Sequence, residues 1–231
     1  MDRLIPKSLD IYDIPERPLR FSPSDDPNDF AEEDLDFNFF NNIDANEIDA
    51  SGLNLYSGEL GLFLADKIKD KSIASYSVVN LSKTTPSIPV FRELIQSFRN
   101  ITHLDTLLLN NNQFPKEAGT VLASLLTSTG LKLRCLYLRD NNIGDQGVAA
   151  LGKSFSTDIS EIKFTIPIPL LSLQVLDLSG NGCGDAGVLS LCRGLVGLSK
   201  HACACNRTVS LKVLRLNKNS LGMTIIFPKK F

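Results

Sequence analysis

The stretch LRCLYLRDNNIGDQGVAAL, residues 133–151, decides the fold. Counted from its first leucine, four apolar residues and one asparagine stand at offsets 0, 3, 5, 8 and 10: Leu133, Leu136, Leu138, Asn141 and Ile143. Alternating apolar residues in the first half are typical of a short strand. The spacing of Val148 and Leu151 in the second half is typical of a helix. The stretch therefore predicts a strand, a turn and a helix within one short unit.

The same spacing recurs three more times. The copies are Leu104, Leu107, Leu109, Asn112 and Phe114; Leu173, Leu176, Leu178, Asn181 and Cys183; and Leu211, Leu214, Leu216, Asn219 and Leu221. This is the spacing of the leucine-rich repeat. One repeat cannot bury its own leucines, so neighbouring repeats stack to cover them. We expect each asparagine to bind backbone groups left unpaired where the strand ends, which makes it scaffold and not a ligand-binding residue.

Two weaker copies precede these four. The first has Ile43, Ile48, Ser51 and Leu53 at offsets 0, 5, 8 and 10; the second has Ile73, Tyr76, Val78 and Leu81 at offsets 0, 3, 5 and 8. Their starts continue the repeat length of 29–31 residues. Apolar residues spaced three and four apart predict a helix after each strand. Asp145 and Asp185 are predicted to cap the helices that they precede.

The domain boundaries follow from this repeat. Residues 39–223 form the predicted leucine-rich repeat domain of about six repeats, with loop insertions near 154–172 and 199–210. Residues 1–38 are an acidic arm that contains five prolines, and we expect it to be disordered or to serve as a docking segment. Residues 224–231 are predicted to form an irregular tail. We expect truncation of a longer repeat protein, with a folded-back cap as the alternative.

The glycines and aspartates after the strand turns carry a family resemblance. Ile143-Gly144-Asp145-Gln146-Gly147 and Gly184-Asp185-Ala186-Gly187 resemble the ribonuclease-inhibitor-like class of leucine-rich repeats. The resemblance implies an α/β fold, a curved horseshoe solenoid with a parallel sheet on the concave side and helices on the convex side. Nearly all members act by binding proteins, so it also implies a non-enzymatic scaffold. The class includes Ran GTPase-activating protein, which makes a GTPase-activating or other enzyme regulator the alternative.

Partner-binding residues are expected on the concave face. Side chains alternate across a strand, so offsets 4 and 6 point away from the core if offsets 3 and 5 point into it. Offset 4 is predicted to hold Glu47, Ser77, Leu108, Tyr137, Asp177 and Arg215, and offset 6 Asp49, Val79, Asn110, Arg139, Ser179 and Asn217. Tyr and Arg are common at binding hot spots. The predicted partner site comprises Tyr137, Arg139, Asp177, Arg215, Asn110 and Leu108.

Two short motifs resemble a nucleotide-binding site and a zinc site, but each has a simpler explanation. Residues 147–154 match the phosphate-binding pattern G-x-x-x-x-G-K-S, which would make a nucleotide-binding enzyme, but they overlap the predicted helix. His201, Cys203 and Cys205 have zinc-ligand types, but a second ligand pair is missing. We therefore expect no cofactor, no metal and no catalytic residues.

Charge and targeting signals bear on the partner class and the cellular location. Residues 1–40 carry eleven acidic and four basic side chains, whereas the whole chain has a net charge of -2. No dense basic stripe suggests nucleic acid, and no apolar stretch suggests a membrane span or a signal peptide. We expect a monomer in the cytoplasm, with the nucleus as the alternative, and a protein partner of unknown identity.

Overall fold

The computed structural model describes residues 47–56, 58–69, 76–99, 101, 103–127, 131–156, 172–204 and 206–222. The chain divides into two units, Met1–Asp36 and Phe37–Phe231, and every described residue belongs to the second. The predicted acidic arm, the C-terminal tail and most of the first insertion lie outside the described residues.

Six three-residue strands form one parallel sheet, in the order in which they follow along the chain. They are β1 (Glu47–Asp49), β2 (Val78–Asn80), β3 (Thr106–Leu108), β4 (Cys135–Tyr137), β5 (Val175–Asp177) and β6 (Val213–Arg215). Each strand pairs with the next at the same repeat position, so that Thr106 lies opposite Cys135 and Cys135 opposite Val175. The sheet therefore advances by one strand per repeat.

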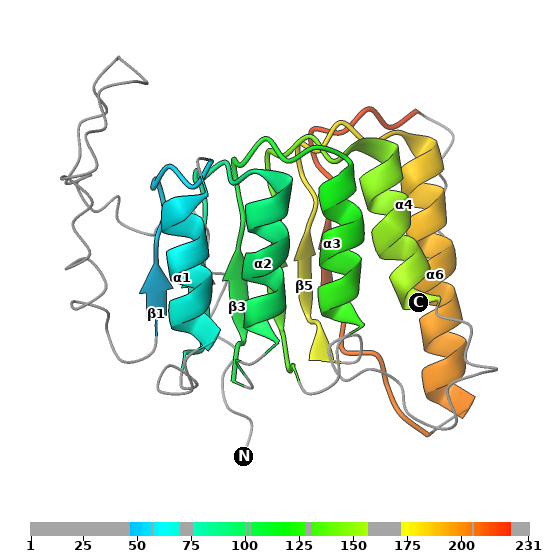
Figure 1. Ribbon diagram of the computed structural model, residues 1–231. Coiled ribbons are helices and arrows are strands. Elements are labelled where there is room, and N and C mark those ends of the chain that lie inside the picture. The colour runs from blue at the N-terminus through cyan, green and yellow to red at the C-terminus, as the bar shows by residue number, and fades with distance from the viewer. Residues whose placement is uncertain are drawn as a thin grey trace. The chain divides into compact units, whose positions relative to one another are not determined.

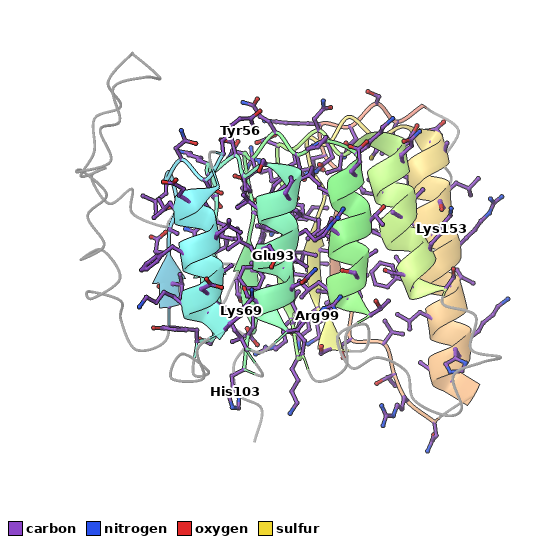
Figure 2. All side chains as sticks on the ribbon, viewed as in Figure 1. Tyr56, Lys69, Glu93, Arg99, His103 and Lys153 are labelled. Atoms are coloured by element: carbon purple, nitrogen blue, oxygen red, sulfur yellow. The ribbon has the colours of Figure 1, made fainter. Side chains whose placement is uncertain are left out.

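A row of helices covers one side of this sheet (Figure 1). They are α1 (Glu59–Lys69), α2 (Ile88–Phe98), α3 (Glu117–Leu126), α4 (Gly144–Phe155) and α6 (Asp185–Ala204). Each helix packs against the helix of the next repeat. Figure 2 shows one such contact, in which Lys69 of α1 reaches Glu93 of α2 at 3.4 Å. This arrangement confirms the predicted α/β repeat solenoid.

The repeat leucines form the core between the sheet and the helices. Leu133, Leu136 and Leu138 have no exposed surface, and the same holds for Leu173, Leu176 and Leu178. The helices contribute the other half of this core, as in α2, where the buried residues are Val90, Phe91, Leu94, Ile95, Ser97 and Phe98. Their spacing of three and four residues keeps one face of the helix on the sheet.

The predicted register of the first two repeats is wrong. Val78 lies opposite Thr106, and Glu47 lies opposite Val78, so the repeats begin at Ala45 and Tyr76 and not at Ile43 and Ile73. Val79, placed on the outer face by the sequence, is fully buried instead. The error has a simple cause. Neither repeat has the turn asparagine, so apolar residues alone left two alignments open.

Thr84 takes the place of that asparagine in the second repeat. Its side-chain hydroxyl donates to the carbonyl of Leu81 at 2.8 Å, and its backbone N–H donates to Oδ1 of Asn112 at 2.6 Å. A hydroxyl is a shorter donor than an amide, but it reaches the same carbonyl at the end of the strand. Thr84 is fully buried, as its role requires.

The asparagines of the later repeats link one repeat to the next. Nδ2 of Asn141 donates to the carbonyls of Leu109 and Leu138, at 2.8 and 2.9 Å, and its Oδ1 accepts from the backbone N–H of Asn112 at 2.8 Å. Asn219 makes the same kind of contacts with Leu178, Leu216 and Asn181. The predicted scaffold role of these residues is confirmed.

The sequence placed a loop over 199–210, but α6 continues to Ala204. Leu198 and Ala202 are both buried and stand four residues apart, so the helix keeps its inner face through this segment. The expectation of a loop is therefore wrong for residues 199–204. Only the part after α6 leads irregularly into β6.

Candidate partner-binding site

The face of the sheet that points away from the helices is the candidate binding surface, and we call it the sheet face. Because the strands are in register, residues at the same repeat position lie side by side across it. The central row is Asp49, Asn80, Leu108, Tyr137, Asp177 and Arg215. The row nearer the strand starts is Glu47, Val78, Thr106, Cys135, Val175 and Val213.

Four of the six predicted site residues stand in one line. The strand pairing places Leu108 beside Tyr137, Tyr137 beside Asp177 and Asp177 beside Arg215. The other two are joined directly, since Oδ1 of Asn110 accepts from the backbone N–H of Arg139 at 2.9 Å. The fold thus gathers the six residues on neighbouring strands and the turns that follow them.

Three of these residues expose too little surface to contact a partner strongly. Leu108, Asn110 and Asp177 are 8%, 6% and 2% exposed. Oδ1 of Asp177 accepts from the backbone N–H of Ser179 at 2.9 Å, and its Oδ2 lies 3.5 Å from Nη1 of Arg215. A buried carboxylate costs free energy unless it is paired in this way. Asp177 therefore acts on its neighbours, by holding the Arg215 guanidinium on the sheet face.

Tyr137 is the aromatic centre of the row and is half-buried. Burial raises the pKa of its phenol, with a smaller upward contribution from Cys135 and an opposing one from Arg215. The Tyr137 hydroxyl also forms a hydrogen bond with the Cys135 thiol of the same strand. Tyr137 can thus offer mainly its ring face to a partner.

Three arginines on or beside the sheet face each have an acidic neighbour. Arg134 lies 3.2 Å from Asp105, Arg139 lies 2.9 Å from Asp140, and Arg215 pairs with Asp177. Such pairs fix the direction of a long side chain but contribute little free energy at an exposed site. A partner carboxylate could therefore engage these guanidinium groups in competition with the local acid.

The sign of the charge changes along the sheet. Glu47 and Asp49 are both on β1, where they give the first repeat an acidic surface. Arg215 and Lys218 are in the last described repeat. The corrected register moves Asp49 into the central row, so the predicted drift from acidic to basic remains.

The phosphate-loop pattern of residues 147–154 lies entirely inside α4. A Cβ on Gly119 of α3 would collide with the backbone of Gly147, so the glycine serves helix packing. Ser154 is 5% exposed, and its hydroxyl donates to the carbonyl of Leu151 at 2.7 Å. A phosphate-binding loop needs free backbone N–H groups before its helix, whereas these are used within α4. The pattern thus arises from the repeat helix.

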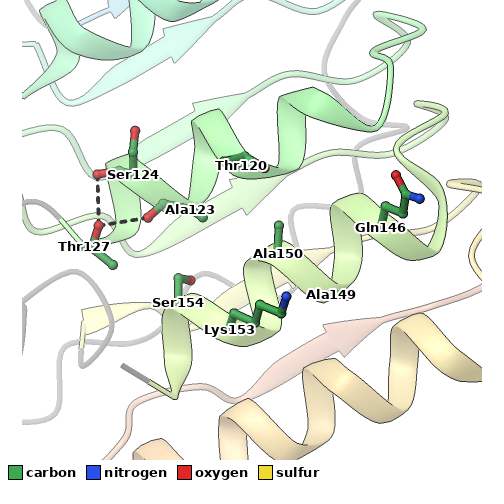
Figure 3. A pocket seen from close by; sticks show the side chains of 9 residues that line it. All are labelled: Thr120, Ala123, Ser124, Thr127, Gln146, Ala149, Ala150, Lys153 and Ser154. Atoms are coloured by element: carbon green, nitrogen blue, oxygen red, sulfur yellow. Dashed lines mark hydrogen bonds between the residues drawn. The ribbon is translucent and has the colours of Figure 1, made fainter. Parts of the chain in front are cut away.

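A shallow groove runs between α3 and α4 on the helical side, with Lys153 and Ser154 on its wall (Figure 3). Small side chains line most of it, and Lys153 points outward from α4 (Figure 2). The Thr127 hydroxyl donates to the carbonyls of Ala123 and Ser124, at 3.1 and 3.2 Å. The polar groups at this end of the groove are therefore engaged within α3.

His201 and Cys203 are held apart by helix geometry, whereas Cys205 lies outside the described residues. His201 and Cys203 are two residues apart in α6, so their side chains leave the helix in different directions. In the part of the chain that the structure describes, no group of three or more His, Cys, Asp or Glu residues could hold a metal ion. The described cysteines Cys135, Cys183, Cys192 and Cys203 are all free thiols. Among the helices that are described, none is long and apolar enough to cross a membrane.

Comparison with known proteins finds matches to parts of the chain. The family model "Leucine Rich repeat" matches residues 131–152 and 170–192. Pig ribonuclease inhibitor is 30% identical over 111 residues, which cover 41% of this chain and 24% of the inhibitor. An internalin from Listeria monocytogenes, known from a crystal structure, has a TM-score of 0.32 at 20% identity and covers 66% of this chain and 38% of its own. The chain therefore spans about a quarter of the length of the pig inhibitor and well under half of the internalin chain.

Proposed function

Because the chain is a leucine-rich repeat protein of the ribonuclease-inhibitor-like class, we propose that it is a non-enzymatic module that binds a protein partner on its sheet face. Stacked repeats of this kind form extended surfaces that are used for binding. The observation that carries the proposal is the line of Leu108, Tyr137, Asp177 and Arg215 across four adjacent strands.

Tyr137 and the two arginines Arg139 and Arg215 are the proposed contact residues. Each keeps part of its side chain accessible, with 22% of the Arg139 side chain and 32% of the Arg215 side chain exposed. Tyr and Arg side chains combine a large contact area with directional donors, which is why they recur at hot spots. Leu108 and Asp177 support the ring and the guanidinium groups and do not themselves make the main contacts.

We infer an orientation of the partner from the change from acidic to basic side chains along the sheet. A partner surface that complements the last repeats would place carboxylates near Arg139 and Arg215. A basic part would lie over Glu47 and Asp49 of the first repeat. Complementary charge of this kind raises the association rate and fixes the register more than it raises affinity.

The name of the porcine relative supplies one partner class for a direct test. That protein is called a ribonuclease inhibitor, and this chain matches about a quarter of it. A ribonuclease is therefore a reasonable first candidate, to be assayed for binding and for loss of activity. The GTPase-regulating alternative and the cytoplasmic location stay predictions.

Affinity capture with three baits tests the sheet face. The baits are the wild-type chain, the variant Tyr137→Ala/Arg139→Glu, and the matched control Tyr56→Ala/Arg92→Glu. The control removes the same groups, from a Tyr56 side chain that is 69% exposed and from an exposed Arg92 in α2. All three are first checked for cooperative melting.

Binding on the sheet face predicts a partner that is retained by the wild type and the control and lost by the sheet-face variant. For a purified partner, the expected loss of affinity is about 10- to 100-fold, because a hot-spot residue contributes at least 1–2 kcal/mol. Equal retention by all three baits would place the binding surface elsewhere and reject the proposal.

A further inference from the structure

The helix α6 ends the row of described helices, and among them it has a neighbour on one side only (Figure 1). On that side it packs on α4 through glycines. A Cβ on Gly187 would lie 2.6 Å from the Asp145 carboxylate, and a Cβ on Gly197 would lie 3.6 Å from the Ser156 side chain. The face of α4 that receives α6 therefore includes Asp145 and Ser156.

The repeat shows which face of α6 corresponds to this receiving face. Asp145 and Asp185 occupy the same repeat position, and each accepts a hydrogen bond from a glycine of the following repeat, Gly184 and Gly222, at 2.7 and 2.8 Å. Residues at the same distance along the chain from these two aspartates are equivalent. The row on α4 is Asp145, Ala149, Gly152 and Ser156, and its equivalent on α6 is Asp185, Leu189, Cys192 and Val196. The second row is the forward face of α6.

Large apolar side chains on this forward face are exposed. Leu189 is 49% exposed and Val196 is 42% exposed, seven residues apart and therefore on one side of the helix. At the equivalent positions α4 has Ala149 and Ser156. The forward face of α6 is thus more apolar than the face of α4 that it resembles, although no described helix packs on it.

We propose that a second copy of this chain covers the forward face, with the two α6 helices antiparallel about a two-fold axis near Cys192 and Arg193. In that register Leu189 packs on Val196 of the partner subunit. Asp185 then lies opposite Lys200 of the partner subunit, so each end of the contact joins an acid to a base. A two-fold axis makes both contacts twice, which is the usual form of a dimer interface.

The charges of α6 favour the antiparallel arrangement over a parallel one. The forward face begins with the carboxylate of Asp185, and Lys200 lies near its other end. Parallel helices would place like charges together, whereas antiparallel helices pair them and also pair the opposite ends of the helix dipoles. Arg193 is exposed beside the apolar row, where its guanidinium stays in water.

The sheet accommodates the same symmetry. Among the described strands β6 is at the edge of the sheet, at the same end of the solenoid as α6. A two-fold axis that makes the α6 helices antiparallel also makes the two β6 strands antiparallel. An exposed edge strand can pair with an antiparallel neighbour. The end of the sheet therefore does not oppose the contact.

The size of the contact sets the expected affinity. A helix of 20 residues is about 30 Å long, and one helix pair buries less than the roughly 1,600 Å² of a standard interface. We expect a reversible dimer with a Kd of about 1–50 µM, which replaces the monomer expected from the sequence alone. The dimer contact is distinct from the sheet face and does not depend on the function proposed for it.

Sedimentation velocity on the full chain is the first test. The chain of 25.3 kDa should shift from one copy towards two as its concentration rises to about 0.1 mM, which exceeds that Kd. Leu189→Glu and Val196→Glu should each weaken the dimer by at least about tenfold, because both place a charge in an apolar contact. Leu62→Glu is the matched control, since Leu62 of α1 is 46% exposed, and it should leave the dimer unchanged.

Thiol cross-linking tests the antiparallel register. A short bis-maleimide should join Cys192 to Cys192 of the partner subunit, near the axis. The two copies of Cys203 would stand about 30 Å apart along the helices and should not be joined. Cross-linked dimer should therefore persist in Cys203→Ser/Cys205→Ser and disappear in Cys192→Ser.

Three results would overturn the proposal. One is a chain that stays monomeric at the highest concentration. A second is a monomer that dimerises only after residues 223–231 are removed, because the tail would then be what covers the face. The third is a dimer that Leu189→Glu and Leu62→Glu affect equally, or one that is cross-linked through Cys203 and not through Cys192.

Discussion

Oδ1 of Asp145 accepts a hydrogen bond from the backbone N–H of Gly187 at 2.9 Å, across the boundary between two repeats. The same oxygen accepts from the N–H of Gly184 at 2.7 Å. Asp145 was expected to cap its own helix, but α4 begins at Gly144 and Ile143 makes no side-chain cap. The carboxylate instead caps the start of α6. It thereby joins adjacent repeats, which in a solenoid contact only their neighbours.

Replacing Asp145 should weaken the junction between the two repeats. Asp145→Ala removes an acceptor from two N–H groups at a helix start and should lower the free energy of unfolding by about 1–2 kcal/mol. Asp66→Ala is the control, because Asp66 is an exposed residue of α1 whose nearest ion-pair partner, Lys69, lies at 3.5 Å. Chemical denaturation measures both. Equal stability of Asp145→Ala and the wild type would show that water replaces the carboxylate fully.

Replacing Asn141 should cost more, because its partners are buried. Asn141→Ala leaves the carbonyls of Leu109 and Leu138 and the N–H of Asn112 without their side-chain partner. We expect a loss of about 2–4 kcal/mol in the free energy of unfolding. The neighbouring Asn142 is exposed, so Asn142→Ala should change stability by less than about 0.5 kcal/mol. Similar losses for the two variants would contradict the role assigned to the buried asparagine.

Two glycine-to-alanine substitutions at the contact of α4 with α6 should change the free energy of unfolding in opposite directions. A Cβ on Gly152 would lie 2.6 Å from the carbonyl oxygen of Ser190, so Gly152→Ala should push the helices apart and cost about 1–3 kcal/mol. A Cβ on Gly197 would meet only ordinary contacts at 3.6 Å and beyond. Gly197→Ala should therefore stabilise α6 by up to about 1 kcal/mol through its higher helix propensity. Thermal melting measures both effects. If both variants melted above the wild type, or both below it, the proposed packing of α4 on α6 would be wrong.

Alkaline pH should destabilise the chain through Cys183. Burial raises the pKa of this thiol from 9.0 to about 11, with Asp145 adding to the increase. The folded state thus keeps the neutral thiol where the unfolded state has already lost its proton. This contribution to stability is complete below pH 9.0 and is lost as the pH rises to about 11.

The loss should amount to roughly 2–3 kcal/mol when complete, since one pKa unit corresponds to about 1.4 kcal/mol. The variant Cys183→Ala isolates this loss. The cavity that it creates lowers stability equally at every pH, and it has no thiol to titrate. Urea unfolding between about pH 7 and pH 10 should show a steeper fall for the wild type than for the variant. Parallel pH profiles would mean that the thiol does not titrate as described.

The sequence by itself determined the repeat. Leucines at fixed offsets, with Asn112, Asn141, Asn181 and Asn219 at the turns, place each strand and each core side chain wherever the pattern is complete. The register failed only in the first two repeats, where Leu53 and Thr84 stand at the turn position. Apolar periodicity tolerates a shift of two or three residues when no turn residue marks the offset. Only the pairing of β1 with β2 and of β2 with β3 removed the ambiguity.

The contacts between repeats were decided by the tertiary structure alone. The sequence brought Tyr137, Arg139 and Arg215 to one face, but it could not show that Asp177 is nearly buried beside Arg215. Nor could it show that Asp145 caps the helix of the following repeat or that Leu189 and Val196 remain exposed on α6. The reason is physical. Periodicity specifies which side of an element faces the core, whereas burial and pairing between elements depend on how closely stacked repeats approach one another.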